Sequence, residues 1–267
     1  MLEISHPAEI QQAVLTMNEL LDIIDLFVIS ETNQTENGDS KQFFFREKLN
    51  KGLLKDILQK ILYIPIYKNK SHINEVFQGE QNIAFERFSR LVKNVNQDDL
   101  IMNFKNSIIP NPKAILFFKL YNGYTLPISF RLKWNVYGYF YQHPNKTVTT
   151  TNVFSFAQFN NQNKEKSQLT IGDLNHYGVW FCDLCFNPND LLSIIQTFDY
   201  EKHLKENANT IDVTYLEDLI GDGIYIDGKT TLKPIHTKDL YYCPTIVSNN
   251  TWKYQSYVNN FYNKIYN

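Results

Sequence analysis

The longest alternation of apolar and polar positions lies in the middle of the chain. From Tyr124 to Val136 every second residue is apolar, and all but one of the residues between them are polar. A period of two predicts a β-strand with one buried face. The apolar run Ile115–Tyr121 precedes it, and Asn122-Gly123, the favoured pair for a type I′ turn, separates the two. We therefore expect a β-hairpin over residues 114–136.

Apolar residues at spacings of three and four predict helices elsewhere. Asn187-Pro188 is a clear helix start, with Asn as the cap and Pro at the first helical position. Ser30–Gln42 is polar and without a period, so we expect a mobile loop there. The helices expected from the spacing cover residues 5–28, 45–62, 83–92, 98–106, 187–207, 214–220 and 251–265.

These elements predict an α+β fold. Its antiparallel sheet is built on the 114–136 hairpin and is packed by the N-terminal helices, the 187–207 helix and the C-terminal helix. A chain of 267 residues with 43% hydrophobic content can form one large domain with a small appendage. We expect a main domain over residues 1–207. Residues 208–267 form a C-terminal extension with a hairpin around Asp227-Gly228 and a terminal helix, packed on the main domain.

Charge and cysteine content narrow the class of protein. The net charge is −2, which argues against non-specific binding to duplex nucleic acid. The first residues lack a basic stretch followed by an apolar run, and no apolar stretch approaches the length of a membrane span. Three cysteines without framework spacing are typical of reduced thiols. We expect a cytoplasmic protein without membrane contact.

Two blocks of the chain carry a resemblance to a known family. Residues 108–133 read as a proline, an apolar strand, a turn and a second strand that ends in a basic residue, and Val179–Leu184 runs into the helix at Asn187. This order resembles an uncharacterised bacterial domain-of-unknown-function family found beside restriction–modification and helicase genes. The resemblance covers roughly residues 43–200. It implies that the gene lies beside restriction–modification and helicase genes, and it provides no catalytic motif.

Asp222, Asp227 and Lys229 are candidate catalytic residues. Two carboxylates that hold a divalent metal and a lysine that polarises water are typical of metal-dependent nucleases. However, the two aspartates are close in sequence, and Asp227-Gly228 is also a preferred type I′ turn. The alternative is a plain hairpin tip.

Cys182 and Cys185 form a Cys-x-x-Cys pair that His236 and Cys243 would complete as a zinc site. Against this hypothesis, the pair lies in an apolar segment that reads as a buried strand, where cysteines are common. The alternative is a pair of core cysteines without a metal.

Arg131, Lys133 and Lys146 lie near Tyr137, Tyr139 and Tyr141, which we take as exposed. Basic residues interleaved with aromatic residues on a sheet are typical of single-stranded nucleic-acid binding. The alternative is a sheet whose aromatic residues pack under helices while its basic residues face solvent.

The chain lacks a phosphate-binding loop, a dinucleotide fingerprint and a Gly-x-Ser-x-Gly motif. Many aromatic residues are available for a protein interface. Our leading hypothesis is a non-catalytic accessory or protein-interaction protein from a bacterial defence or mobile-element locus, with a protein partner and no cofactor. A metal-dependent nuclease and a single-stranded nucleic-acid binder are the alternatives.

Overall fold

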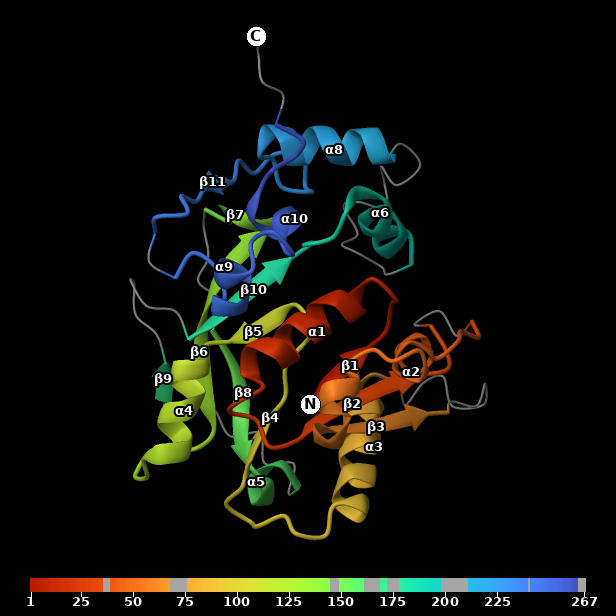
Figure 1. Ribbon diagram of the computed structural model, residues 1–267, viewed down its shortest axis with the longest axis vertical. Coiled ribbons are helices and arrows are strands. Elements are labelled where there is room, and N and C mark those ends of the chain that lie inside the picture. Colours follow the sequence, from red (N-terminus) through yellow and green to blue (C-terminus); the bar gives the residue numbers. More distant parts are fainter. Residues whose placement is uncertain are drawn as a thin grey trace. The chain divides into compact units, whose positions relative to one another are not determined.

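The computed structural model describes residues 1–35, 39–67, 76–144, 149–160, 169–171, 178–197, 211–239 and 241–263 (Figure 1). The chain folds as two compact units, each made of three segments. Unit 1 comprises Met1–Asn106, Ile115–Ser129 and Thr151–Thr170, and unit 2 comprises Ser107–Ala114, Phe130–Thr150 and Ile171–Asn267. The expected domain boundary at residue 207 lies outside the described residues, so that division stays a prediction.

Unit 1 is organised on a three-stranded parallel sheet. Its strands, in the order β1-β2-β3, are β1 (Leu2–Ile4), β2 (Phe27–Thr32) and β3 (Ile61–Ile66). All six residues of β2 are buried, as expected for the central strand of a parallel sheet. The connections are helical: α1 (Glu9–Leu20), α2 (Phe44–Asn50) and the 3-10 helix η1 (Lys55–Lys60).

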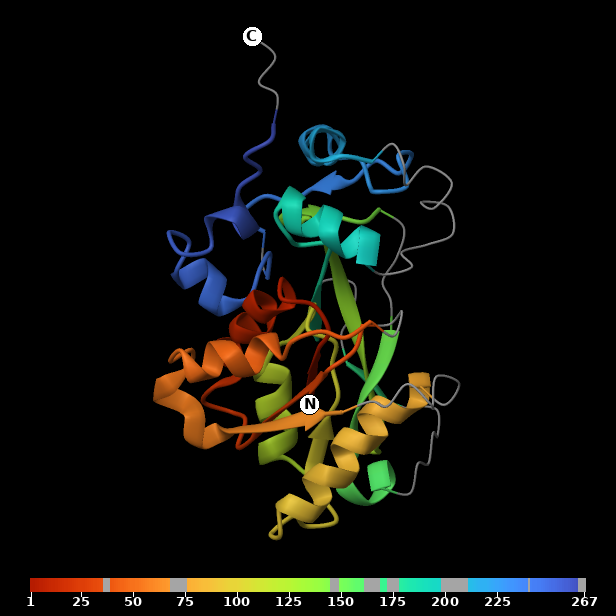
Figure 2. The same ribbon diagram turned by 90° about the vertical axis from the view of Figure 1, so that its right-hand side faces the viewer.

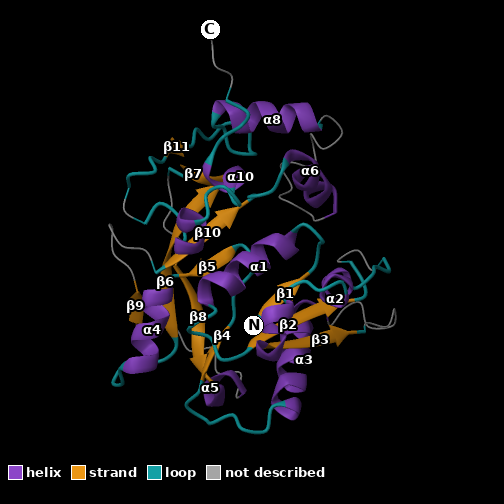
Figure 3. Ribbon diagram, viewed as in Figure 1, coloured by secondary structure: helices purple, strands orange, loops and turns teal. Residues whose placement is uncertain are grey.

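The remaining elements of unit 1 cover this sheet and add a strand pair. Helix α3 (Val76–Leu91) places Phe85 and Phe88 in one apolar cluster with Val28 and Ile64 of the sheet. Strand β4 (Leu100–Met102) pairs antiparallel with β8 (Thr149–Ser155). The short elements α5 (Phe156–Asn160) and β9 (Leu169–Ile171) follow (Figure 3).

Unit 2 is organised on strand β10 (Val179–Asp183). It pairs antiparallel with β5 (Ile108–Pro110) and parallel with residues 132–136 of β6 (Ile128–Val136). Strand β7 (Gly138–Gln142) continues antiparallel from β6 after a bulge at Asn135/Val136 and pairs with β11 (Lys233–Pro234). The α+β class with antiparallel pairing is therefore confirmed.

Helices complete unit 2 (Figure 2). Helix α6 (Pro188–Thr197) and α8 (Val213–Asp222) bury Leu191, Leu216 and Ile220 in one cluster with Val136 and Tyr141. Helix α8 begins at the Asp212 cap, whose side chain accepts the Tyr215 N–H, and ends before Gly223 in the left-handed region at φ 67°. Helices α9 (Thr245–Asn249) and α10 (Gln255–Val258) are short.

The prediction that the 114–136 hairpin begins with a strand is wrong. Residues 112–120 form helix α4 (Pro112–Leu120), because Asn111 Oδ1 accepts the Lys113 N–H at 3.0 Å and Pro112 occupies the first helical position. Ile115 and Phe118, three residues apart, form its buried side. Gly123, at φ 92°, follows the helix instead of making a hairpin turn. The second strand is confirmed as β6.

Several other boundaries differ from the prediction. The first helix stops at Leu20, and Val28 lies in β2, which also takes up the start of the expected 30–42 loop. The remainder of that loop contains a Gln34–Ser40 bridge, and residues 36–38 lie outside the described part. The expected 98–106 helix is the strand β4, which Ile101 anchors in the core.

The expected 187–207 and 251–265 helices differ in outcome. The first is confirmed up to Thr197, and residues 198–210 lie outside the described part. Over 251–263, the described part of the second, the only helix is the short α10. Across the residues that the structure describes, we find no helix long and apolar enough to cross a bilayer.

Candidate functional site

The carboxyl end of the parallel sheet of unit 1 gathers charged side chains around Glu31. Glu31 is fully buried at the penultimate position of β2. Its carboxylate accepts the N–H of Phe45 at 3.0 Å, the N–H of Arg46 at 3.4 Å and the hydroxyl of Tyr63 at 2.8 Å. It therefore joins β2, β3 and the first turn of α2. Ligands of open parallel sheets bind at this end of the strands.

Two cations lie in the same region. The Lys41 ammonium is 5.5 Å from the centre of the Phe44 ring and interacts electrostatically with Glu9. The positive charge of Arg46 acts on the hydroxyl of Tyr63. Burial, assisted by the hydrogen bond to Glu31, raises the pKa of Tyr63, so this hydroxyl stays protonated and donates. We call Glu9, Glu31, Lys41, Arg46 and Tyr63 the sheet-end cluster.

Glu9 closes the cluster on the side of β1. Its carboxylate accepts the N–H of Ser5 at 2.7 Å and that of His6 at 2.9 Å, where the chain leaves β1 for α1. Burial raises the pKa of Glu9, and the hydrogen bonds from His6 and Ser5 oppose this rise only in part. The cluster thus contains two carboxylates that are already bonded to backbone amides, together with two cations.

Unit 2 contains a second buried carboxylate, Asp183, at the carboxyl end of β10. Its Oδ2 accepts the indole N–H of Trp134 at 3.2 Å and the hydroxyl of Tyr225 at 3.0 Å. The His143 ring stacks on Trp134, with the ring centres 4.2 Å apart. We call Trp134, His143, Asp183 and Tyr225 the Asp183 cluster. The rings of Trp134, His143 and Tyr225 contact one another, and all members except Trp134 are buried.

A disulfide between Cys182 and Cys185 brackets Asp183. Leu184, between them, has a left-handed backbone at φ 56°, which turns the chain sharply at the end of β10. The prediction of reduced thiols is therefore wrong for this pair. Its two sulfurs are bonded to each other, Cys243 is buried outside the disulfide, and His236 is exposed. As a disulfide, Cys182 and Cys185 are not the thiolate ligands that the predicted zinc site with His236 and Cys243 requires.

The candidate nuclease residues lie around the Asp227 turn. The Asp227 carboxylate accepts the N–H of Lys229 at 2.9 Å, the N–H of Thr230 at 2.8 Å and the Thr230 hydroxyl at 2.6 Å. Desolvation opposes ionisation of Asp227, but these hydrogen bonds outweigh it and lower its pKa. Asp222 is exposed at the end of α8. Among the described residues, no three His, Cys, Asp or Glu side chains are grouped as a metal site.

The basic candidates for nucleic-acid binding differ in their exposure to solvent. Lys133 is buried, and its ammonium donates to the Tyr241 carbonyl at 3.1 Å. Burial also lowers the Lys133 pKa. Arg131 is partly exposed, and Lys146 lies outside the described residues. The nearby tyrosines, expected to be exposed, are buried, so they cannot stack on bases (buried: Tyr137, Tyr139, Tyr141).

Comparisons with known proteins show the family of this chain. The family model described as Glycosyltransferase family 17 matches residues 4–228. The chain belongs to glycosyltransferase family 17. It is also similar to curated proteins named "Beta-1,4-mannosyl-glycoprotein 4-beta-N-acetylglucosaminyltransferase": those of Homo sapiens and Rattus norvegicus at 25% identity, and that of Mus musculus at 24%.

The alignments cover most of this chain but only about half of each relative. Each alignment is 280 positions long and covers 92% of this chain and 52% of the relative, so the chain spans about half the length of these relatives. No solved structure is significantly similar to the chain.

Family membership corrects several expectations. The resemblance to a bacterial family beside restriction–modification genes is wrong, because the family match is to glycosyltransferases. The hypotheses of a non-catalytic accessory protein from a defence locus, a nuclease and a single-strand binder are overturned by the same finding. The cytoplasmic placement is overturned as well, since the relatives are named for transfer to glycoproteins.

The residues of both clusters were missed from the sequence. Glu31 follows the apolar run Phe27–Ile29, and an acidic residue at the end of a buried strand is the signal that marks it. Asp183, at the end of Val179–Cys182, carries the same signal, but it lies inside a Cys-x-x-Cys pair that favours a metal site. Their partners come from distant segments, and no local pattern reveals them.

Proposed function

We propose that this chain transfers N-acetylglucosamine from an activated donor to a mannose-bearing glycan of a glycoprotein. The observation that carries the proposal is the family match over residues 4–228, which includes all of the sheet-end and Asp183 clusters. The names of the curated relatives supply the sugar and the acceptor. The reaction class comes from the family, and the substrates are our extension to this chain.

The reaction requires the protein to assist proton loss from the acceptor and to stabilise the charge of the leaving group. An acceptor hydroxyl attacks the anomeric carbon of the donor sugar and loses its proton, while the bond from that carbon to the leaving group breaks. When the donor is a nucleoside-diphosphate sugar, the leaving group is a diphosphate that gains negative charge. Fixed cations near that charge lower the barrier more effectively than mobile water does.

The sheet-end cluster fits the donor side of this reaction. It lies at the carboxyl end of a parallel sheet and contains two cations: Arg46, whose side chain is exposed, and Lys41, which lies over the Phe44 ring. The guanidinium of an arginine suits a diphosphate because it donates two parallel hydrogen bonds. Glu31 and Tyr63 position this arginine, since Glu31 accepts its backbone N–H and that of Phe45.

Product analysis with purified full-length protein tests the proposal. The donor is UDP-N-acetylglucosamine, and the acceptor is a glycopeptide that carries β-1,4-linked mannose. Mass spectrometry should show an acceptor heavier by one N-acetylhexosamine. Absence of transfer from any nucleotide sugar to this acceptor and to free mannosides would contradict the proposal.

A matched pair of variants tests the role of the cluster. Arg46→Ala removes the exposed guanidinium at the first turn of α2 and should lower kcat/KM about 100-fold, as for the loss of one transition-state contact. Lys48→Ala removes an exposed cation from the same helix and should leave kcat/KM unchanged. Equal effects of the two variants would place the donor elsewhere in the chain.

A further inference from the structure

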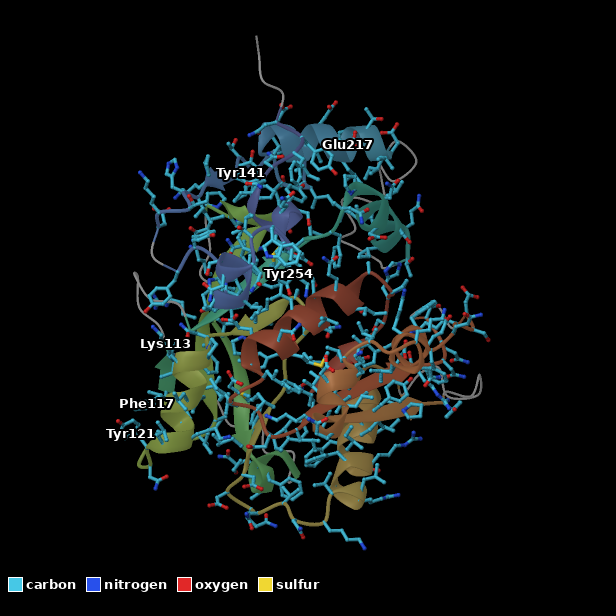
Figure 4. All side chains as sticks on the ribbon, viewed as in Figure 1. Lys113, Phe117, Tyr121, Tyr141, Glu217 and Tyr254 are labelled. Carbon is cyan, nitrogen blue, oxygen red and sulfur yellow. A yellow bond between two sulfur atoms is a disulfide. The ribbon has the colours of Figure 1, made fainter. Side chains whose placement is uncertain are left out.

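Helix α4 exposes a row of large apolar side chains. Four neighbouring residues remain exposed, and we call them the α4 face: Leu116 (42%), Phe117 (47%), Leu120 (66%) and Tyr121 (58%). The rings of Phe117 and Tyr121 are stacked, with their centres 5.0 Å apart, and project from the same side of α4 (Figure 4). Neighbouring exposed apolar side chains often mark an interaction site, whereas single ones are common on any protein surface.

The opposite side of α4 packs against the rest of unit 1. Ile115 and Phe118 are buried and line an apolar cavity of about 590 Å³ in unit 1. The Lys119 ammonium fixes the helix by donating to the Ile23 carbonyl at 2.7 Å and to the Asp25 carboxylate at 2.9 Å. Tyr121 extends the helix, since its N–H donates to the Phe117 carbonyl at 3.0 Å. Helix α4 is therefore fixed by its other residues, and the α4 face is not needed to keep the helix in place.

The geometry limits what can cover this face. A helix with apolar residues on all sides is normally enclosed by protein or lipid. Helix α4 has 9 residues. At ~1.5 Å per residue it is too short to cross a ~30 Å hydrocarbon core. Four side chains of at most roughly 200 Å² each, about half exposed, offer about half of the ~800 Å² per partner of a stable protein interface.

We propose that the α4 face docks on a lipid surface. Apolar side chains that protrude from a convex helix can enter the boundary between headgroups and acyl chains without a matching groove. Leu116, Phe117 and Leu120 supply the apolar contact. Tyr121, with an apolar ring and a polar hydroxyl, suits the interface itself. This proposal is independent of the proposed transfer reaction and of the residues that carry it.

Vesicle co-sedimentation of the full-length protein tests the proposal. The vesicles consist of phosphatidylcholine alone or of phosphatidylcholine with one-fifth phosphatidylserine, and the bound fraction is measured over a range of lipid concentration. We expect wild-type protein to bind both. Leu120→Glu and Phe117→Glu should each weaken binding about tenfold, because they replace an inserted apolar group by a charge.

Leu91→Glu is the matched control. Leu91 is 62% exposed at the end of α3 and is not part of the α4 face. The Leu91 variant should bind vesicles as the wild type does, and all three variants should keep the wild-type circular dichroism and unfolding midpoint. Failure of the wild type to bind either vesicle would overturn the proposal, as would equal losses in Leu91→Glu and Leu120→Glu. Lipid-free self-association that Leu120→Glu abolishes would also overturn it and assign the face to a second copy.

Discussion

Glu31 in unit 1 and Asp183 in unit 2 occupy comparable places and have different surroundings. Each is a buried carboxylate near the carboxyl end of a strand with a parallel neighbour, and each accepts a tyrosine hydroxyl. Glu31 also accepts two backbone amides, and Arg46, which supplies one of them, has an exposed side chain. Asp183 instead accepts an indole and is enclosed by aromatic rings.

The difference separates a carboxylate that organises a charged surface from one that organises a core. Beside Glu31, the exposed side chain of Arg46 can meet an anionic ligand. Around Asp183, the polar atoms are directed inward and the disulfide fixes the turn. A buried carboxylate is therefore not by itself a sign of a catalytic site, and the groups beside it decide what it can do. The following variants test this distinction, from the largest expected effect to the smallest.

Glu31→Ala should have the largest effect on stability. It removes the acceptor of two backbone N–H groups and of the Tyr63 hydroxyl in a fully buried position. We expect the free energy of unfolding to fall by about 4 kcal/mol, measured by urea denaturation. Tyr63→Phe removes one of the three hydrogen bonds and should cost about 1 kcal/mol. If the two variants cost the same, the backbone bonds of Glu31 contribute nothing.

Asp183→Ala should cost about 3 kcal/mol, because the Trp134 indole and the Tyr225 hydroxyl lose a charged acceptor. Asp183→Asn keeps one acceptor oxygen and should cost about half as much. Thermal unfolding monitored by tryptophan fluorescence measures both values. On the comparison above, the kcat/KM of the Asn variant, assayed well below its melting temperature, should stay near that of wild type. A 100-fold loss of kcat/KM at intact fold would instead give Asp183 a place at the substrate.

The disulfide should contribute less than either carboxylate. Cys182 and Cys185 are separated by 3 positions, and so short a loop restricts the unfolded chain only slightly. Replacing both cysteines by serine should lower the free energy of unfolding by about 2 kcal/mol. Addition of a reducing agent should lower the stability of the wild type and leave the double variant unchanged. A loss in the double variant on reduction would show that the agent acts elsewhere.

Glu9 should produce the smallest effect, visible as a change with pH. Burial raises its pKa in the folded protein above the ordinary value of 4.5. The stability linked to its proton is therefore complete below pH 4.5 and is lost as the pH rises through the raised pKa. Glu9→Gln cannot titrate, so its stability relative to wild type should increase from about pH 4 to about pH 7. A difference that is constant over this range would contradict the raised pKa.

The same two-residue signal shows what the sequence could and could not reveal about the fold. Asn187-Pro188 and Asn111-Pro112 both start helices, and in each the asparagine Oδ1 accepts a backbone N–H at 3.0 Å. Only the first predicts a helix from the sequence alone, because Leu191, Ile194 and Ile195 follow it with helical spacing. After Pro112, apolar residues occupy every side of the helix, so the period was hidden. The strand expected over Tyr124–Val136 forms as β6 but begins only at Ile128, and its polar residues Ser129, Lys133 and Asn135 are buried as well.

The candidate site was less accessible to prediction than the fold. Glu31, Arg46 and Tyr63 come from three elements, and their meeting depends on the parallel pairing of β2 with β3. Parallel pairing leaves no alternation in the sequence, because both faces of the strands are covered. The burial of the β7 tyrosines cannot be read from the strand for a related reason. Tyr139 packs on Tyr257 of α10, and Tyr141 packs in the cluster of α6 and α8, so the residues that cover them come from distant parts of the chain.

The interleaving of the two units has a practical consequence for dissecting this protein. Because each unit draws on three separate stretches, no single cut separates the two units. A cut after residue 170 keeps all of unit 1 together with two stretches of unit 2, and a cut before residue 107 keeps all of unit 2 together with two stretches of unit 1. Cloning a minimal catalytic fragment by truncation is therefore a poor strategy here. A stand-alone version of unit 1 would require its three stretches to be rejoined by designed linkers.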